Sequence, residues 1–143
     1  MATKLFVRRR DGQVEVRLND VGRGIVREVF AHVLAGERDP EHEWNLSLNP
    51  PINPSNDNDD PLSILARQSE TASNAELAVM TLQEQNLTDA EAWAWLCTLQ
   101  VGLRTMAIMN GILSDEKLES APTELLDDIR TLQQFLFDLS GCF

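Results

Sequence analysis

Hydrophobic side chains recur at three- and four-residue steps over residues 87–112, the longest uninterrupted helical pattern in the chain. Thr88 precedes the pattern and Glu91 follows three residues later, so the two side chains can form a capping box. Asn110 and Gly111 tolerate the left-handed conformation with which helices commonly end. The pattern therefore predicts a central helix. Its expected core positions are Leu96, Leu99, Leu103 and Met106.

Residues 4–18 form two strand-like runs on either side of Asp11 and Gly12. An Asp-Gly pair is a strong hairpin signal, because a type I′ turn requires positive φ at both central residues. Apolar and polar residues alternate along the second run, which predicts one buried and one solvated face. A hairpin alone is marginally stable, so its apolar face should pack on helices. The buried positions of the second run are expected to be Val14, Val16 and Leu18.

An amphipathic helix is expected directly after the hairpin, over about residues 20–35. Asn19 or Asp20 can cap its N-terminus, and Gly36 offers a stop at its C-terminus. Its buried stripe is expected to consist of Val21, Ile25, Val29, Phe30, Val33 and Leu34.

Residues 37–60 break the helical pattern, because they hold four of the six prolines and no periodic apolar positions. They predict a long acidic, proline-rich loop, pinned by Trp44 or Leu46. A helical bundle should fill residues 61–143, beginning with two short helices or one interrupted helix and ending with an amphipathic helix. The expected fold is one mainly helical α+β domain over residues 1–143, with an N-terminal β-hairpin packed on about four to five helices.

Charge is distributed unevenly along the chain, whose formal net charge is −11. Residues 1–38 hold eight Lys/Arg against five Asp/Glu, whereas residues 39–143 hold four against eighteen. This asymmetry indicates a basic surface at one end of an acidic body. An acidic surface also simply keeps a small protein soluble. The arginines that can contribute to a basic surface are Arg8, Arg9, Arg10, Arg17, Arg23 and Arg27.

The chain contains no run of about 18 apolar residues and no hydrophobic N-terminal stretch before a cleavage site, so a cytoplasmic location is expected. Cys97 and Cys142 match neither a disulfide framework nor a zinc spacing. Two unrelated thiols are the simpler expectation in a reducing compartment. If the terminal helix packs antiparallel to the central helix, the two thiols could approach and form a redox-responsive disulfide.

No catalytic or metal-binding group of residues can be named from the spacing. His32 and His42 carry no signature that ties either of them to a nucleophile. Glu41 and Glu43 flank His42, but a loop does not orient them as a helix-borne metal motif does. The acidic run after Asp57 lacks the glycine and the glutamate of a calcium loop. We therefore expect a non-enzymatic protein with no cofactor and no metal.

Trp93 and Trp95 cannot both face the centre of the core, because they lie two residues apart on one helix. One should lie at the core margin, either covered by the loop or hairpin, or anchoring a partner protein or the second subunit of a homodimer. For the arginines, contacts with acidic helices or with a partner protein are favoured. A nucleic-acid interface is the alternative, disfavoured by the acidic body and by the absence of a helix-turn-helix signature.

Four features together resemble an actinobacterial family of unknown function: the segment RRRDGQVEVRL, the helix after it, the acidic proline-rich loop and the segment LTDAEAWAWLCTLQVGLRTMAIMNGI. Its members are small cytoplasmic proteins, some described as possible transcriptional regulators and often encoded near the ClpS adaptor. The resemblance assigns no catalytic residues. Together with the charge asymmetry and the absence of a catalytic group, it favours a regulatory or adaptor protein that acts by protein–protein binding. The resemblance is carried by Trp95, Leu96, Leu103, Arg104 and Gly111.

Overall fold

The computed structural model describes residues 4–39, 41, 42, 44, 61–110 and 122–143. The expected loop over residues 45–60, with Leu46, lies outside the described residues. Within them the fold is mainly helical α+β, with four helices and a small antiparallel sheet. The strands are β1 (Phe6–Arg8), β2 (Val14–Val16) and β3 (Asn86–Leu87), and the helices are α1 (Asp20–Arg38), α3 (Pro61–Met80), α4 (Asp89–Met109) and α6 (Thr123–Ser140).

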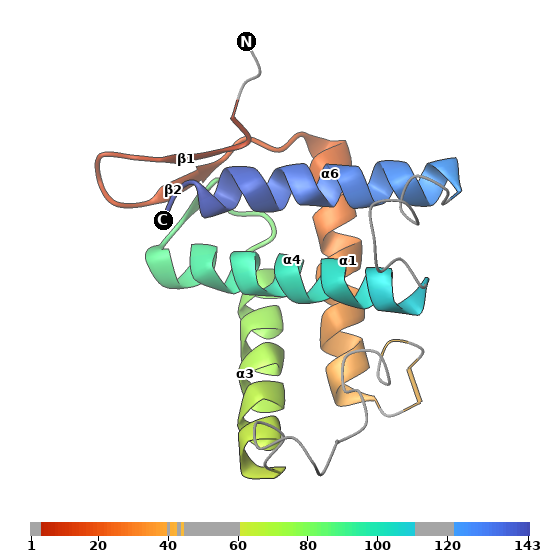
Figure 1. Ribbon diagram of the computed structural model, residues 1–143. Coiled ribbons are helices and arrows are strands. Elements are labelled where there is room, and N and C mark those ends of the chain that lie inside the picture. The colour runs from red at the N-terminus through yellow and green to blue at the C-terminus, as the bar shows by residue number, and fades with distance from the viewer. Residues whose placement is uncertain (1–3, 40, 43, 45–60, 111–121) are drawn as a thin grey trace.

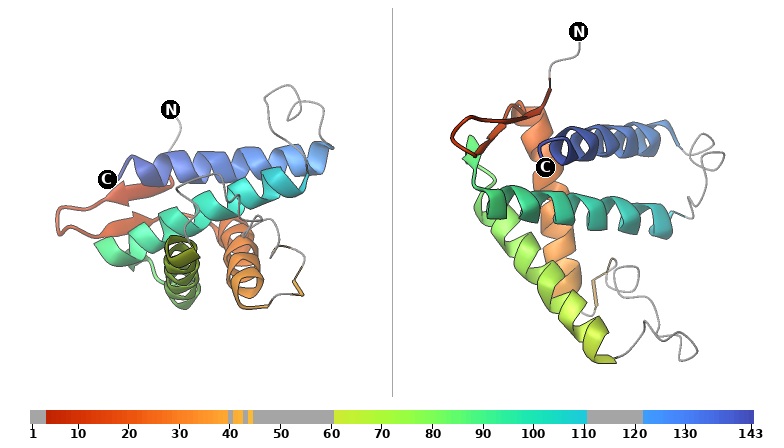
Figure 2. Two further views of the ribbon diagram at one scale, coloured as in Figure 1. Left: turned by 60° about the horizontal axis from the view of Figure 1, so that its bottom comes forward. Right: turned by 60° about the vertical axis from the view of Figure 1, so that its left-hand side comes forward.

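The helices form two antiparallel pairs that cross each other (Figure 1). α1 and α3 run side by side in opposite directions, and α4 packs across both of them. α6 runs antiparallel to α4 on the side away from α3 (Figure 2). The hairpin lies beside the end of α6 and the start of α4, so the first and last described segments of the chain meet there. The predicted hairpin packed on helices is confirmed.

The sheet has the strand order β1-β2-β3, and both pairings are antiparallel. Phe6 pairs with Val16 and Arg8 with Val14, while Val14 also lies opposite Leu87. The third strand was not predicted, because two residues are too few to produce an alternating pattern. It completes the three strands that a hairpin needs to become stable.

The expected burial of the second hairpin run is confirmed, because all three of its predicted core positions are buried. The predicted type I′ turn is wrong. Gly12 has a φ of 89°, but Asp11 does not have positive φ. The Gly12 N–H donates to the Arg9 carbonyl at 3.1 Å, and the left-handed glycine follows this turn. This is the geometry of a three-residue hairpin loop with a glycine bulge, which needs positive φ only at the glycine.

α1 begins as predicted, because the Asn19 side chain accepts a hydrogen bond from the Gly22 N–H at 2.8 Å. The predicted stop at Gly36 is wrong, since Gly36 is a buried position inside a helix that runs to Arg38.

Of the predicted stripe of α1, Val29, Phe30 and Val33 are buried, and Ile25 and Leu34 are partly buried against the core. Val21 is exposed, and Val26 is fully buried in its place. Val26 lies three and four residues before Val29 and Phe30, so it shares their face, whereas Val21 does not.

α3 is one continuous helix, so the break expected in this region, between two short helices or within one, is wrong. Ala75 and Ala78 face the core, and Leu82 is buried just after the helix. Met80 is exposed.

The capping box of α4 is confirmed. The Thr88 N–H donates to the Glu91 carboxylate at 2.9 Å, and the Glu91 N–H donates to the Thr88 hydroxyl at 3.3 Å. Leu99 is buried as predicted, but the fully buried side chain of the preceding turn is Trp95. The other predicted core positions of α4 are only partly buried and pack against the core: Leu96, Leu103 and Met106.

Trp95 lies at the centre of the core with no exposed surface. Its indole packs edge to face against Phe6 and Phe30, with ring centroids 6.1 Å and 5.2 Å away. Its Nε1–H donates to the hydroxyl of Thr81 at 2.8 Å. The side chain of Trp95 on α4 thus contacts the hairpin, α1 and the end of α3.

α1 and α4 cross closely at Gly102. A Cβ at this position would lie 2.4 Å from Cγ1 of Val29, which is closer than real side chains approach. The glycine is therefore required by the separation of the two helices.

We expect Gly102→Ala to lower the free energy of unfolding by about 1–3 kcal/mol, because the methyl group must displace a stiff β-branched side chain. The matched control is Gly24→Ala on α1, where a Cβ meets nothing within 4 Å. Alanine there should stabilise the helix by up to about 1 kcal/mol. Urea unfolding measures the change in the free energy of unfolding for both variants. Equal stabilisation by the two substitutions would contradict the close crossing of α1 and α4.

We expect Thr81→Val to cost about 1–3 kcal/mol, because it leaves the Trp95 indole N–H without an acceptor in the core. Thr105→Val is the control, since the hydroxyl of this buried threonine donates to the Val101 carbonyl of its own helix at 2.8 Å. Urea unfolding followed by tryptophan fluorescence separates the two. The same midpoint for both variants would show that the indole hydrogen bond contributes nothing.

Candidate functional site

Arg8 connects three segments that are far apart in the sequence. Its Nη1 donates to the carbonyl of Gly12 at 2.5 Å and forms an ion pair with Asp89, the first residue of α4. Its Nε donates to the carbonyl of Cys142 at 3.0 Å. The guanidinium therefore joins the hairpin loop, the start of α4 and the residues that follow α6.

Two aromatic side chains extend this junction to the surface. The Arg8 guanidinium lies over the ring of Phe143, with its Cζ 5.3 Å from the ring centroid. Phe143 in turn packs edge to face against Trp93, with centroids 5.7 Å apart. Both rings are about half exposed, at 51% for Phe143 and 49% for Trp93. We name this group the Arg8 corner and define it as Arg8, Asp89, Trp93, Cys142 and Phe143.

Local structure explains why these side chains converge. Arg8 is the last residue of β1, and the capping box places Asp89 on the first turn of α4. Trp93 lies one helical turn after Asp89 and therefore on the same face. Leu139 is fully buried in the last turn of α6, which brings the residues after it beside the hairpin.

The two tryptophans occupy the two environments that their spacing predicts. Trp95 is fully buried, and Trp93 is the one at the margin of the core. Sequence reasoning did not find Phe143, because it belongs to no periodic pattern and lies after the terminal helix.

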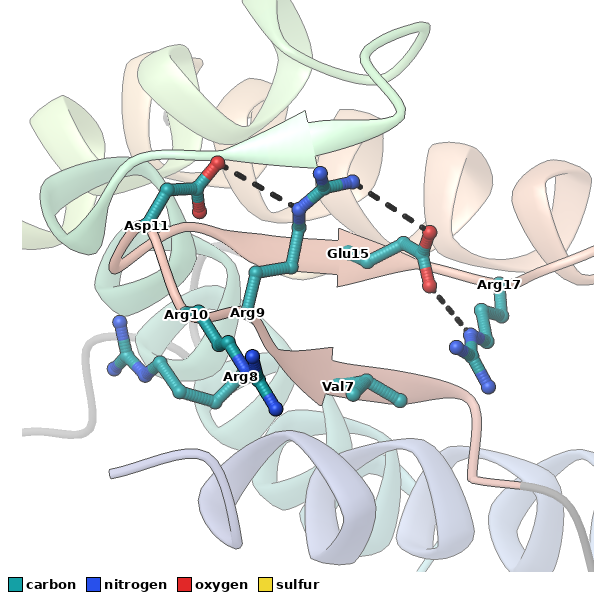
Figure 3. A pocket seen from close by; sticks show the side chains of 7 residues that line it. All are labelled: Val7, Arg8, Arg9, Arg10, Asp11, Glu15 and Arg17. Carbon is teal, nitrogen blue, oxygen red and sulfur yellow. Dashed lines mark hydrogen bonds and ion pairs between the residues drawn. The ribbon is translucent and has the colours of Figure 1, made fainter.

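The outer face of the hairpin carries a hollow of about 510 Å³ (Figure 3). Arg9 lies 3.6 Å from the carboxylate of Asp11 and 3.8 Å from that of Glu15. Arg17 approaches the second oxygen of Glu15 at 2.5 Å. Two carboxylates thus pair with two of the arginines. The hollow is lined by Val7, Arg8, Arg9, Arg10, Asp11, Glu15 and Arg17.

Arg10 differs from its neighbours. It is exposed at the hairpin loop and forms no ion pair or hydrogen bond within the part of the chain that the structure describes. Because Arg8, Arg9 and Arg17 each pair with a carboxylate, the lining keeps, among the described residues, an unpaired positive charge at Arg10.

The other two arginines predicted for the basic surface, Arg23 and Arg27, are not among the residues that line the hollow. Arg23 donates from Nη1 to the carbonyls of Leu82 and Glu84, at 2.7 Å and 3.2 Å. Arg23 therefore joins the start of α1 to the chain that follows α3. Arg27 is exposed on α1.

The structure also brings together both histidines and a tryptophan, which the sequence did not indicate. The rings of His32 and Trp44 stack with centroids 5.0 Å apart, and His42 lies 5.6 Å from His32. The Trp44 N–H donates to Nδ1 of His42 at 3.1 Å. Trp44 is buried, so its predicted docking is confirmed. Among the described residues, no three His, Cys, Asp or Glu are placed to hold a metal ion.

Cys97 and Cys142 are both free thiols. Burial raises the pKa of the Cys97 thiol, and the charge of Glu70 on α3 raises it further. Burial also raises the pKa of Cys142, while Arg8 and Lys4 act in the opposite direction. α6 does run antiparallel to α4, but the two thiols have different charged neighbours. The redox-formed disulfide stays a prediction.

Within the described residues, none of the helices is both long and apolar enough to cross a bilayer. Comparisons of the chain with protein-family models, with curated proteins and with solved structures find no match.

We expect Glu70→Gln to lower the pKa of Cys97, because it removes a negative charge that disfavours the thiolate. Around pH 8, just below the ordinary thiol pKa of about 8.5, alkylation of Cys97 by iodoacetamide should then quicken about twofold. The gain is small because the charge of Glu70 is the smaller of the two causes that raise this pKa. Cys142 serves as the internal control in site-resolved mass spectrometry, and an equal change at both cysteines would contradict the assignment.

Proposed function

We propose that this protein is a non-enzymatic adaptor or regulator that acts by binding another protein at the Arg8 corner and the adjoining hairpin surface. The observation that carries the proposal is the half-exposed indole of Trp93, held where three distant segments of the chain meet. Tryptophan and arginine are the residues that most often dominate the binding energy of protein interfaces.

The surroundings of Trp93 support this use. A rigid indole on a helix loses little conformational freedom on binding, and the ring of Phe143 already packs against it. The adjoining hollow presents cationic groups at the rim, where charge favours encounter and correct orientation. In protein interfaces, an aromatic centre that becomes buried on binding is usually surrounded by a polar rim.

Nucleic-acid binding through the hairpin arginines is the second candidate, and the four arginines that line the hollow are the observation in its favour. Against it, Asp11, Glu15 and Asp89 lie among these arginines and pair with three of them. Protein binding is therefore the better supported of the two. A role in transcription regulation and a cytoplasmic location, which the family resemblance implies, belong to the same proposal.

Affinity capture at modest salt, from a lysate of the organism that encodes the chain, tests the proposed function. We expect Trp93→Ala to reduce the recovery of specific partners by about tenfold or more, as the loss of a hot-spot side chain does. Phe137→Ala is the matched control, because Phe137 is an exposed aromatic residue on α6 that is 74% accessible.

The outcome is read by quantitative mass spectrometry, with circular dichroism to check that both variants are folded. Sedimentation of the wild type and of Trp93→Ala shows whether the partner is a second copy of the chain. Recovery of no specific protein, or equal losses with both variants, would refute protein binding at this surface.

A further inference from the structure

We infer that the Arg8 corner accepts an acidic peptide segment that carries an aromatic side chain, and that Phe143 occupies the place of this side chain in the free protein. The inference rests on the proposed function and deepens it, because it assigns the chemistry of the partner. It also gives the chain a built-in competitor for its own binding surface.

The contacts of Phe143 show which chemistry the corner accommodates. Its ring lies under the Arg8 guanidinium and against the edge of Trp93, with planes at 77°. The carbonyl of the preceding residue, Cys142, accepts a hydrogen bond from Nε of Arg8. In the free protein, an aromatic ring thus contacts the Arg8 cation and the Trp93 indole, and the main-chain carbonyl before the ring accepts from the N–H of Arg8.

The ring can leave this position without unfolding the helix that carries it. The main chain is tied to the last turn of α6, since the Cys142 N–H donates to the Leu139 carbonyl and the Phe143 N–H to that of Ser140. Leu139 remains buried in the core as an anchor. Rotation of the half-exposed Phe143 side chain alone uncovers the Trp93 ring and the face of the Arg8 guanidinium, while Nε of Arg8 stays bonded to the Cys142 carbonyl.

Charge indicates that the incoming segment is acidic. Residues 4–18 hold five Lys/Arg against two Asp/Glu, and Arg10 next to the corner has no partner among the described residues. The acidic body of the chain does not cancel this local field, because salt screens exposed charges beyond about 8 Å under physiological conditions. A carboxylate one or two residues from the aromatic side chain can reach Arg10 or displace Asp89 from Arg8.

A peptide fits these charges better than a nucleic acid does. A nucleic-acid strand carries one phosphate for about every 3.4 Å of helix axis, so it meets Asp11 and Asp89 as well as the arginines between them. A peptide can place its carboxylates opposite Arg8 and Arg10, and it need not place one opposite Asp11 or Asp89. Only the peptide also supplies an aromatic side chain of the kind that Phe143 places in the corner.

The direct test uses a fluorescein-labelled peptide with a single phenylalanine, Asp-Glu-Asp-Glu-Phe-Asp-Glu-Asp-Glu, and fluorescence anisotropy at low salt. We expect Phe143→Ala to bind it about fivefold or more tightly than the wild type, because no Phe143 ring then has to leave the binding position first. Trp93→Ala should bind more weakly than the wild type, and Phe137→Ala should match it. Binding to Phe143→Ala that is absent, or no tighter than to Phe137→Ala, overturns the inference.

The charge requirement is tested separately. Arg10→Glu should weaken binding of the same peptide about fivefold or more, whereas Arg104→Glu, an exposed arginine on α4, should not change it. Probes with alanine for phenylalanine, or with Asn and Gln for the acidic residues, should both bind more weakly. Equal binding of either probe overturns the assigned chemistry, as does tighter binding of a single-stranded DNA oligonucleotide.

The two proposals can fail independently. If a partner is captured through Trp93 but the peptide does not distinguish Phe143→Ala, the assigned occupant is wrong and the proposed function stands. If no partner is captured and no variant binds the peptide, both are refuted.

Discussion

The burial of Trp95 is the constraint on which the rest of the structure depends. Its ring fills the space between Phe6 of the hairpin and Phe30 of α1, and its N–H is satisfied by Thr81 after α3. An unsatisfied indole N–H would be costly in a dry core, so the hydrogen bond makes this one packing arrangement much better than its alternatives. Because α4 must turn Trp95 inward, Trp93 is carried about 200° around the helix axis and reaches the surface. The core contact thus creates the exposed residue on which the functional proposal rests.

The Arg8 corner depends on the same orientation of α4. Asp89 and Trp93 share a helical face, and the antiparallel course of α6 brings Cys142 and Phe143 to that face. Exposed ion pairs contribute little to stability, so the main effect of Arg8 is to hold these segments in a defined geometry. A surface assembled from three segments depends on the position of each of them, so a change in any one segment alters the surface.

The charge asymmetry of the chain has a more specific meaning in the folded protein than in the sequence. Arg23 clamps α1 to the chain after α3, and Arg9 and Arg17 pair with Glu15. The excess of basic residues therefore does not form a uniform polycationic surface. It leaves a local positive charge around Arg10, next to an aromatic anchor, within a body that is otherwise acidic.

Local interactions explain what the sequence alone determined. The capping box of Thr88 and Glu91, the Asn19 cap and the alternation of the second hairpin strand involve residues at most a few positions apart, so their patterns are visible without a fold. Only the tertiary structure decided which tryptophan is buried, added the third strand and placed Phe143 under an arginine 135 positions earlier. Periodicity specifies that a helix has an apolar face, but the direction of that face depends on the shapes and hydrogen-bond partners of distant segments. The element types therefore followed from the sequence, whereas the candidate site exists only where those segments meet.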